Sequence, residues 1–245
     1  MRFITINSLL WSITALFGLL LSLVLAWHIL SPVSFFYSQW YDLLAVDENI
    51  AEYGPLNRNR IGFETTSRAE HERLMGELVV AINNNGIGFE EINYHDNDGK
   101  VIDSLLTAAE LAHMRDVSHL VRWMKVCAVG LALLMVALLI ALRKASVLMP
   151  SLPSLSVKML GLVAVLVGGV LLIGPVKVFY QLHVWLFPDK NQWFFYYEDS
   201  LMTTLLKAPV IFAPIAMVLL LVALVVWWLG FSMIAHFMRP VTVNE

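Results

Sequence analysis

Four long apolar runs dominate this chain and decide what it can fold into. They cover about residues 8–30, 121–142, 157–182 and 208–237, and polar segments separate them. Each run is long enough for a helix that crosses the hydrocarbon core of a bilayer, which takes roughly 20 apolar residues. The chain is 59% hydrophobic with a mean hydropathy of +0.72, above the composition of ordinary soluble domains. The pattern predicts an α-helical membrane protein with four transmembrane helices.

The first run lies near the N-terminus, where a cleaved signal peptide is the alternative to a membrane anchor. A signal peptide carries roughly 7–15 apolar residues, and this run is about twice as long. No convincing Ala-x-Ala cleavage site follows it. We therefore expect a retained anchor.

The charges outside the runs predict how the chain crosses the membrane. Basic residues near both termini and between the second and third runs place both termini in the cytoplasm by the positive-inside rule. The basic residues are Arg2, Arg143, Lys144, Lys158 and Arg239, and the loop before the fourth run holds Asp189, Lys190, Glu198 and Asp199. The predicted parts are an N-terminal anchor (1–30), an extracytoplasmic domain (31–120), spans two and three with a short cytoplasmic loop (121–182), an extracytoplasmic loop (183–207), and span four with a short cytoplasmic tail (208–245).

Several functional classes are disfavoured by what the chain lacks. Transporters and pumps usually need carboxylates or histidines within the membrane. The charged residue that lies well within an apolar run here is Lys177. It is close to the outer end of that run, where its side chain can reach the interface. A net charge of −3 without a basic patch does not indicate a nucleic-acid partner. The single cysteine, Cys127, lies within the second run, where we expect a small core residue rather than a nucleophile.

Two helices are predicted in the segment 31–120. Ser67–Glu70 and Thr107–Glu110 are capping boxes, in which a hydroxyl and a glutamate bond each other's backbone N–H groups. The first helix should end at Asn83–Gly86, where Gly86 can take a positive φ. The second meets no breaker before Arg143, so we expect one continuous helix that leads into the second span.

A β-hairpin is predicted between these helices. Ile87–His95 and Lys100–Leu105 are the expected strands, and Asn97-Asp98-Gly99 is the turn. The spacing of Asp96 and Asp98 is faintly similar to a calcium loop, but the glutamate that such a loop needs is missing. The hairpin is therefore the favoured interpretation.

Two histidines are the candidates for catalysis. His113 precedes the second span and His183 follows the third, so both belong at the outer membrane interface although they lie 70 positions apart. Imidazoles exchange protons near neutral pH and suit general acid–base catalysis. Taken alone, His183 is more typical of an interfacial aromatic belt. Expected supporting groups are Glu110 and Asp116 beside His113, and Asp199 or Glu198 beside His183.

Other chemistries fit the sequence less well. Glu110-x-x-His113 is half of a di-iron motif, but the second copy on a facing helix is missing, and no metal is expected. No Gly-x-Ser-x-Gly nucleophile elbow appears. Any acyl transfer would therefore be direct, without an acyl-enzyme intermediate.

Two segments resemble one known family. ELAHMRDVSHLVRWM (110–124) resembles the signature Glu-x-x-His-hydrophobic-x-Asp-Val of the bacterial lipoprotein intramolecular transacylases, known as Lit. The segment 179–214 resembles the second signature of that family: a Leu-His or Phe-His pair, an aromatic run with Trp, an acidic residue, then Leu and a hydrophobic-Pro-hydrophobic segment. The family's two essential histidines correspond to His113 and His183.

The resemblance implies a fold and a reaction. The fold is a base of four membrane helices with a small α+β extracytoplasmic domain between spans one and two. The reaction moves an acyl chain from the glycerol sn-2 oxygen of a diacylglyceryl lipoprotein to the α-amine of its N-terminal cysteine, without a cofactor, in the bacterial plasma membrane. The implied partners are the lipid-modified N-terminus of lipoproteins and membrane phospholipid.

Roles for further residues follow from that reaction. Arg115, Lys177 and Trp193 are candidates for contact with the substrate, and a kink at Gly174-Pro175 would open room for acyl chains between the spans. Two alternatives stay open at this point: a non-enzymatic membrane protein whose outer domain binds a partner, and an acyltransferase that acts on phospholipid.

Overall fold

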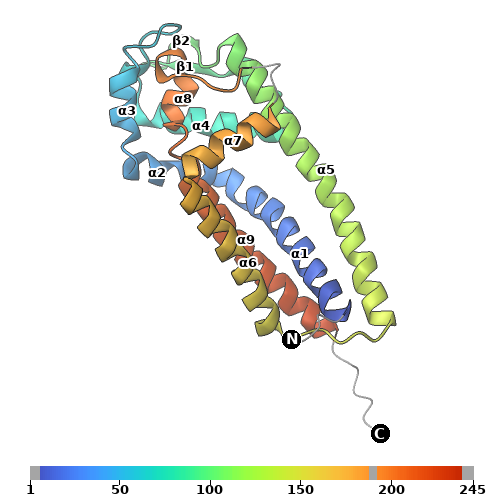
Figure 1. Cartoon of the computed structure of the whole chain (residues 1–245). Helices are drawn as coiled ribbons and strands as arrows, with labels where there is room; N and C mark the ends of the chain where they lie inside the picture. The colour runs from blue at the N-terminus through green and yellow to red at the C-terminus, as the bar shows by residue number, and fades with distance from the viewer. Residues whose placement is uncertain (1–5, 188–191, 239–245) are drawn as a thin grey trace. The chain divides into compact units, whose positions relative to one another are not determined.

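The computed structural model describes residues 6–187 and 192–238 (Figure 1). Arg2, Asp189, Lys190 and Arg239, on which the predicted orientation rests in part, lie outside these ranges. The chain divides into two compact units. The helical unit contains the described residues up to His28, Met124–Leu172, and the described residues from Leu219. The mixed unit contains Ile29–Trp123 and Ile173–Val218.

Four helices in the described part of the chain are long and apolar enough to cross a membrane, as predicted. They are α1 (Ile6–Leu30), α5 (Ala108–Lys144), α6 (Leu152–Ile173) and α9 (Phe212–Phe237). The first candidate span continues beyond α1 to Leu43, through the 3-10 turn η1 (Ser31–Phe36) and the short helix α2 (Tyr37–Leu43). The continuous helix predicted from Thr107 to Arg143 is confirmed by α5.

The predicted third span was wrong in its extent. It ran from 157 to 182, whereas α6 ends at Ile173 and a separate helix, α7 (Pro175–Leu186), follows. Gly174 between them has φ 102° and ψ 121°, which is far from helical, and Pro175 has no N–H to continue the ladder of hydrogen bonds. The expected kink is thus a complete break, and His183 lies within α7 rather than at the end of a spanning helix.

The helical unit is held by an apolar core. Trp227 Nε1 donates a hydrogen bond of 2.9 Å to the carbonyl of Ala15, and Gly18 leaves room for the ring of Phe231. The buried residues of the core are Trp11, Ala15, Leu19, Leu142, Leu155, Met159, Val163, Trp227 and Phe231. Cys127 was expected in such a core, and this was wrong, because it is exposed on α5. The contact of α5 with the core comes later in the helix, around Leu138 and Leu142.

In the mixed unit, α4 (Arg68–Asn83) follows its predicted cap only in part. Ser67 Oγ accepts a hydrogen bond from the Glu70 N–H at 3.2 Å. The reciprocal bond is replaced, because the Glu70 carboxylate instead binds Arg73 and the His95 backbone. The predicted end of the helix is confirmed, with Gly86 at φ 83°.

The predicted hairpin forms with a shorter first strand. The strands are β1 (Asn93–His95) and β2 (Val101–Ser104), which pair antiparallel, with Tyr94 opposite Asp103. The start of the predicted strand was wrong: Phe89–Glu91 is a 3-10 turn, η3, that follows Gly88 at φ 101°. The turn itself is confirmed, since Gly99 has φ 78° and the Asp96 side chain accepts from the N–H groups of Asp98 and Lys100.

A short buried helix organises the rest of the mixed unit. This helix, α8 (Leu201–Leu206), follows the 3-10 turn η4 (Tyr197–Asp199) and lies in the segment 183–207, which was expected to be a loop. Asn49 of α3 (Val46–Tyr53) donates to the Thr204 carbonyl at 2.8 Å, and the Tyr37 hydroxyl donates to the Leu205 carbonyl at 2.8 Å. These bonds supply partners to carbonyls in the last turn of α8, where the Thr204 carbonyl also accepts from the Lys207 N–H at 3.1 Å.

Candidate active site

Glu110 fixes the start of α5. The predicted capping box is confirmed: Glu110 Oε2 accepts from the Thr107 N–H at 2.7 Å, and Thr107 Oγ1 accepts from the Glu110 N–H at 3.3 Å. The Glu110 side chain is completely buried, and its second oxygen accepts from the Ser200 hydroxyl. Ser200 is the N-cap of α8, where its oxygen accepts from the Thr203 N–H at 2.9 Å. One carboxyl group therefore joins the beginnings of two helices.

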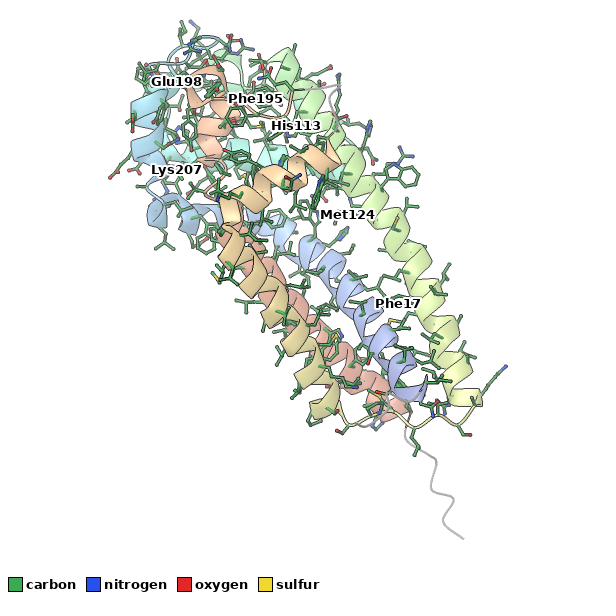
Figure 2. The ribbon with its side chains drawn as sticks, in the orientation of Figure 1. Phe17, His113, Met124, Phe195, Glu198 and Lys207 are labelled. Atoms are coloured by element: carbon green, nitrogen blue, oxygen red, sulfur yellow. The ribbon has the colours of Figure 1, made fainter. Side chains whose placement is uncertain are left out.

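His113 lies one turn beyond Glu110 and is buried. It retains 6% of its exposed area, and Figure 2 shows it on α5 where α7 lies alongside. Phe187 contacts its ring edge-on, with centroids 5.0 Å apart, and the ring of Phe195 is 6.1 Å away. Among the described residues, His113 Nδ1 has no hydrogen-bond partner. A buried polar atom without a hydrogen-bond partner costs free energy. A polar group of the substrate is therefore a suitable partner for this nitrogen.

His183 has a defined tautomer. Its Nδ1 lies 2.8 Å from the carbonyl oxygen of Phe179, one turn earlier in α7. A carbonyl can only accept, so Nδ1 carries the hydrogen and Nε2 carries the free lone pair of the neutral ring. Burial lowers the pKa of His183 below its ordinary value, against the opposing effect of the Phe179 carbonyl. The ring is therefore neutral at neutral pH, and Nε2 is able to accept a proton.

The two histidines are neighbours, as the sequence predicted. Their ring centroids are 6.2 Å apart and the rings are inclined by 39°. Phe187 touches both, with its centroid 5.4 Å from that of His183. Two imidazoles from α5 and α7 thus lie in one aromatic environment, an arrangement in which one can accept a proton while the other donates one.

Of the residues expected to support the histidines, Asp116 lies near its histidine in the helix, whereas Asp199 and Glu198 bond Arg58. Asp116 is half-buried on α5, one turn after His113. The Asp199 carboxylate accepts from Arg58 Nη1 at 3.0 Å, while the Phe179 carbonyl, rather than an acidic side chain, binds His183 Nδ1. Glu198 bonds Arg58 through its backbone: the Glu198 carbonyl accepts a hydrogen bond from the Arg58 N–H at 2.8 Å.

The expected substrate contacts also differ from one another. Arg115 is exposed and forms an ion pair with Glu90. Lys177 is exposed on α7. Trp193 lies against His183, with ring centroids 5.4 Å apart.

Sequence reasoning missed four residues of this site: Phe179, Phe187, Phe195 and Ser200. Phe179 had a usable signal, because a residue four positions before a helical histidine offers its carbonyl on the same face. Ser200 had a weaker one, since a serine three residues before a threonine is a possible N-cap. Among the described residues, no group of three or more His, Cys, Asp or Glu side chains is placed to hold a metal ion.

Comparison with known families decides what kind of protein carries this site. The family model of the lipoprotein intramolecular transacylase Lit matches residues 8–212. The chain belongs to the Lit family. The match contains Glu110, both histidines and Ser200. Lit proteins are transacylases that act on lipoproteins, so the chain is a multi-pass membrane enzyme of lipoprotein modification. No curated protein and no solved structure matches the chain.

Proposed function

We propose that the chain moves an acyl chain from the glycerol sn-2 oxygen of a diacylglyceryl lipoprotein to the α-amine of its N-terminal cysteine. The product is an N-acylated lyso-form lipoprotein. The observation that supports this most is the pair of adjacent imidazoles, 6.2 Å apart in an aromatic environment, in a member of the Lit family.

The reaction needs one base and one acid. A bond forms between the amine nitrogen and the acyl carbon, and the bond from that carbon to the sn-2 oxygen breaks. The α-ammonium loses a proton to become nucleophilic, and the departing oxygen gains one. The nitrogen loses a second proton as the amide forms, so it gives up two protons in all. One offsets the proton that the departing oxygen gains and the other is released to solvent, and both histidines return to their starting state by proton exchange.

The tautomer of His183 favours it as the base. Its Nδ1–H is held by the Phe179 carbonyl, which leaves Nε2 to accept the proton of the ammonium. His113 is then the group that donates to the ester carbonyl or to the departing oxygen, and its unpartnered Nδ1 supports such a contact.

Direct transfer of the acyl chain, without an acyl-enzyme intermediate, agrees with the state of the nearby hydroxyl group of Ser200. The Ser200 hydroxyl is buried and bound by Glu110 and the Thr203 N–H, so it is engaged in capping and unsuited to form an acyl-enzyme. Donor and acceptor belong to the same substrate molecule, and holding them together can supply several kcal/mol of the barrier reduction.

The location of the site is part of the proposal. With both termini in the cytoplasm, by the positive-inside rule, the mixed unit and the two histidines lie at the extracytoplasmic face of the bacterial plasma membrane. Mature lipoproteins and phospholipid headgroups would be accessible there.

The test uses a bacterial host whose lipoproteins are only diacylated. Expression of the chain should produce N-acyl lyso-lipopeptides, detected by mass spectrometry of the N-terminal peptides. His113→Ala and His183→Ala should abolish this product. His119→Ala, on the same helix but exposed, should not.

The same spectra distinguish the alternatives. Intramolecular transfer keeps two acyl chains on each lipopeptide, whereas transfer from phospholipid adds a third. Unchanged diacyl lipopeptides in cells that contain the folded chain would support the non-enzymatic, partner-binding alternative and contradict the proposal.

A further inference from the structure

Three aromatic rings surround His183. Their centroids lie 4.0 Å (Phe179), 5.4 Å (Phe187) and 5.4 Å (Trp193) from the centroid of the imidazole. The rings are tilted from the imidazole plane by 38°, 44° and 39°. We call Phe179, Phe187 and Trp193 the aromatic sleeve. Trp193 was expected to contact the substrate, but its observed contact is with the proposed base.

A buried base has a difficulty that such rings can relieve. Burial removes water that would otherwise solvate the imidazolium, and it therefore makes the protonated form unfavourable. The face of an aromatic ring is electronegative and attracts a cation within about 6 Å of its centroid, most strongly for tryptophan. Because Nδ1 already carries a hydrogen, a proton taken up at Nε2 makes the whole imidazole cationic, with its centroid 4.0–5.4 Å from the centroids of these three rings.

We propose that the aromatic sleeve, and Trp193 above all, stabilises the protonated form of His183 by cation–π interaction. This inference rests on the proposed function, because it explains how His183 serves as a base while buried. Phe179 acts twice, through its ring and through its carbonyl. Trp193 is a positioning residue that acts through His183.

The other titratable groups near His183 are few in the described residues. His113 faces it from α5, with Asp116 one turn further along that helix. On α7, Tyr180 contacts Trp193, with centroids 6.2 Å apart. In the segment that carries Trp193, Asp199 pairs with Arg58. The α9 residue packed against this group of rings is Phe212, which is not titratable and stacks on Phe179. Substitution of Trp193 leaves all these groups in place, so its effect reports on the ring.

The first measurement is the pKa of His183 by NMR. The full chain with ¹³C-labelled histidine is titrated in detergent, and the His183 resonance is assigned by its loss in His183→Ala. Singly and doubly fluorinated tryptophan, incorporated at position 193, withdraw electron density from the ring but keep its shape. The pKa should fall stepwise, by about half a unit to one unit in total. Trp193→Phe should give a smaller fall, and Trp185→Leu, at an exposed position of α7, none.

The second measurement is the pH profile of acyl transfer in detergent with a synthetic diacyl lipopeptide. The acid limb should move to lower pH in the same order as the NMR values, with little change in KM. A raised KM with an unchanged His183 titration would show that Trp193 contacts the substrate, and would overturn the inference. A flat titration across the fluorinated series would also overturn it.

The two proposals fail in different ways. Wild-type chain that titrates as expected but forms no lyso-lipopeptide would refute the proposed function and leave the aromatic sleeve intact. Active chain with a flat titration would do the reverse. Circular dichroism of each variant checks that it is folded. If Trp193→Phe does not fold, the titrations of the fluorinated series provide the test.

Discussion

Removal of the Glu110 side chain should destabilise the mixed unit more than removal of an exposed glutamate. In Glu110→Ala, the half-buried Thr107 N–H loses the acceptor that it has at 2.7 Å. An orphaned buried donor costs about 1–3 kcal/mol. The Ser200 hydroxyl loses Glu110 too, but it can turn to Thr203 Oγ1 at 2.9 Å, so its cost is smaller.

The total is about 3 kcal/mol once the lost cap of α5 is included. For a chain of this length that corresponds to a fall in Tm of roughly 6–12 °C. Glu110→Gln should cost only about 1 kcal/mol, because its oxygen still accepts from Thr107 and its amide can donate to Ser200.

The assay is thermal unfolding in detergent, followed by intrinsic tryptophan fluorescence. Glu90→Ala is the matched control, since Glu90 also pairs with a partner (Arg115) but its side chain is 61% exposed; its loss should cost under about 1 kcal/mol. If Glu110→Ala and Glu90→Ala unfold at the same temperature, the account of Glu110 as the buried link between α5 and α8 is wrong.

Two further predictions concern stability. His71 is buried between Tyr41 and Thr66, and burial lowers its pKa to about 4; neutral His71 therefore stabilises the fold fully above pH 6.5, and about 3 kcal/mol should be lost as the pH falls from 6.5 towards 4. Tm measured across that range should drop, and His71→Gln should flatten the curve; an equally steep curve in the variant would assign the loss to other groups. Gly174→Ala, at φ 102°, should cost about 1–2 kcal/mol, whereas Gly130→Ala, which meets no atom within 4 Å on α5, should be neutral or stabilising. Equal Tm values for the two alanine variants would contradict the strained conformation at Gly174.

Local patterns in the sequence predicted what depends on local interactions. Hydropathy predicted the four spans. The Thr107–Glu110 cap formed because both partners lie within one turn, and Gly86 ended α4 because the position requires a positive φ. The proximity of His113 and His183 followed from counting spans, which is a global constraint readable from the sequence.

The remainder depends on contacts that are distant in sequence. Ser200 bonds Glu110 from 90 positions away, and no local pattern indicates that pairing. The same holds for α8, whose carbonyls are satisfied by Asn49 and Tyr37, so a segment expected to be a loop became a buried helix. Glu70 left its predicted cap because His95, brought close by the hairpin, competes for its oxygens together with Arg73 of the same helix.

The most direct test of the central claim follows the acyl chain itself. Purified chain is incubated with a synthetic diacyl lipopeptide whose sn-2 chain alone carries deuterium, and the product is fragmented in a mass spectrometer. The account predicts deuterium on the cysteine nitrogen, a free sn-2 hydroxyl, and no such product from His183→Ala or His113→Ala. Deuterium that stays on glycerol, or that reaches the nitrogen equally well in both variants, would contradict it.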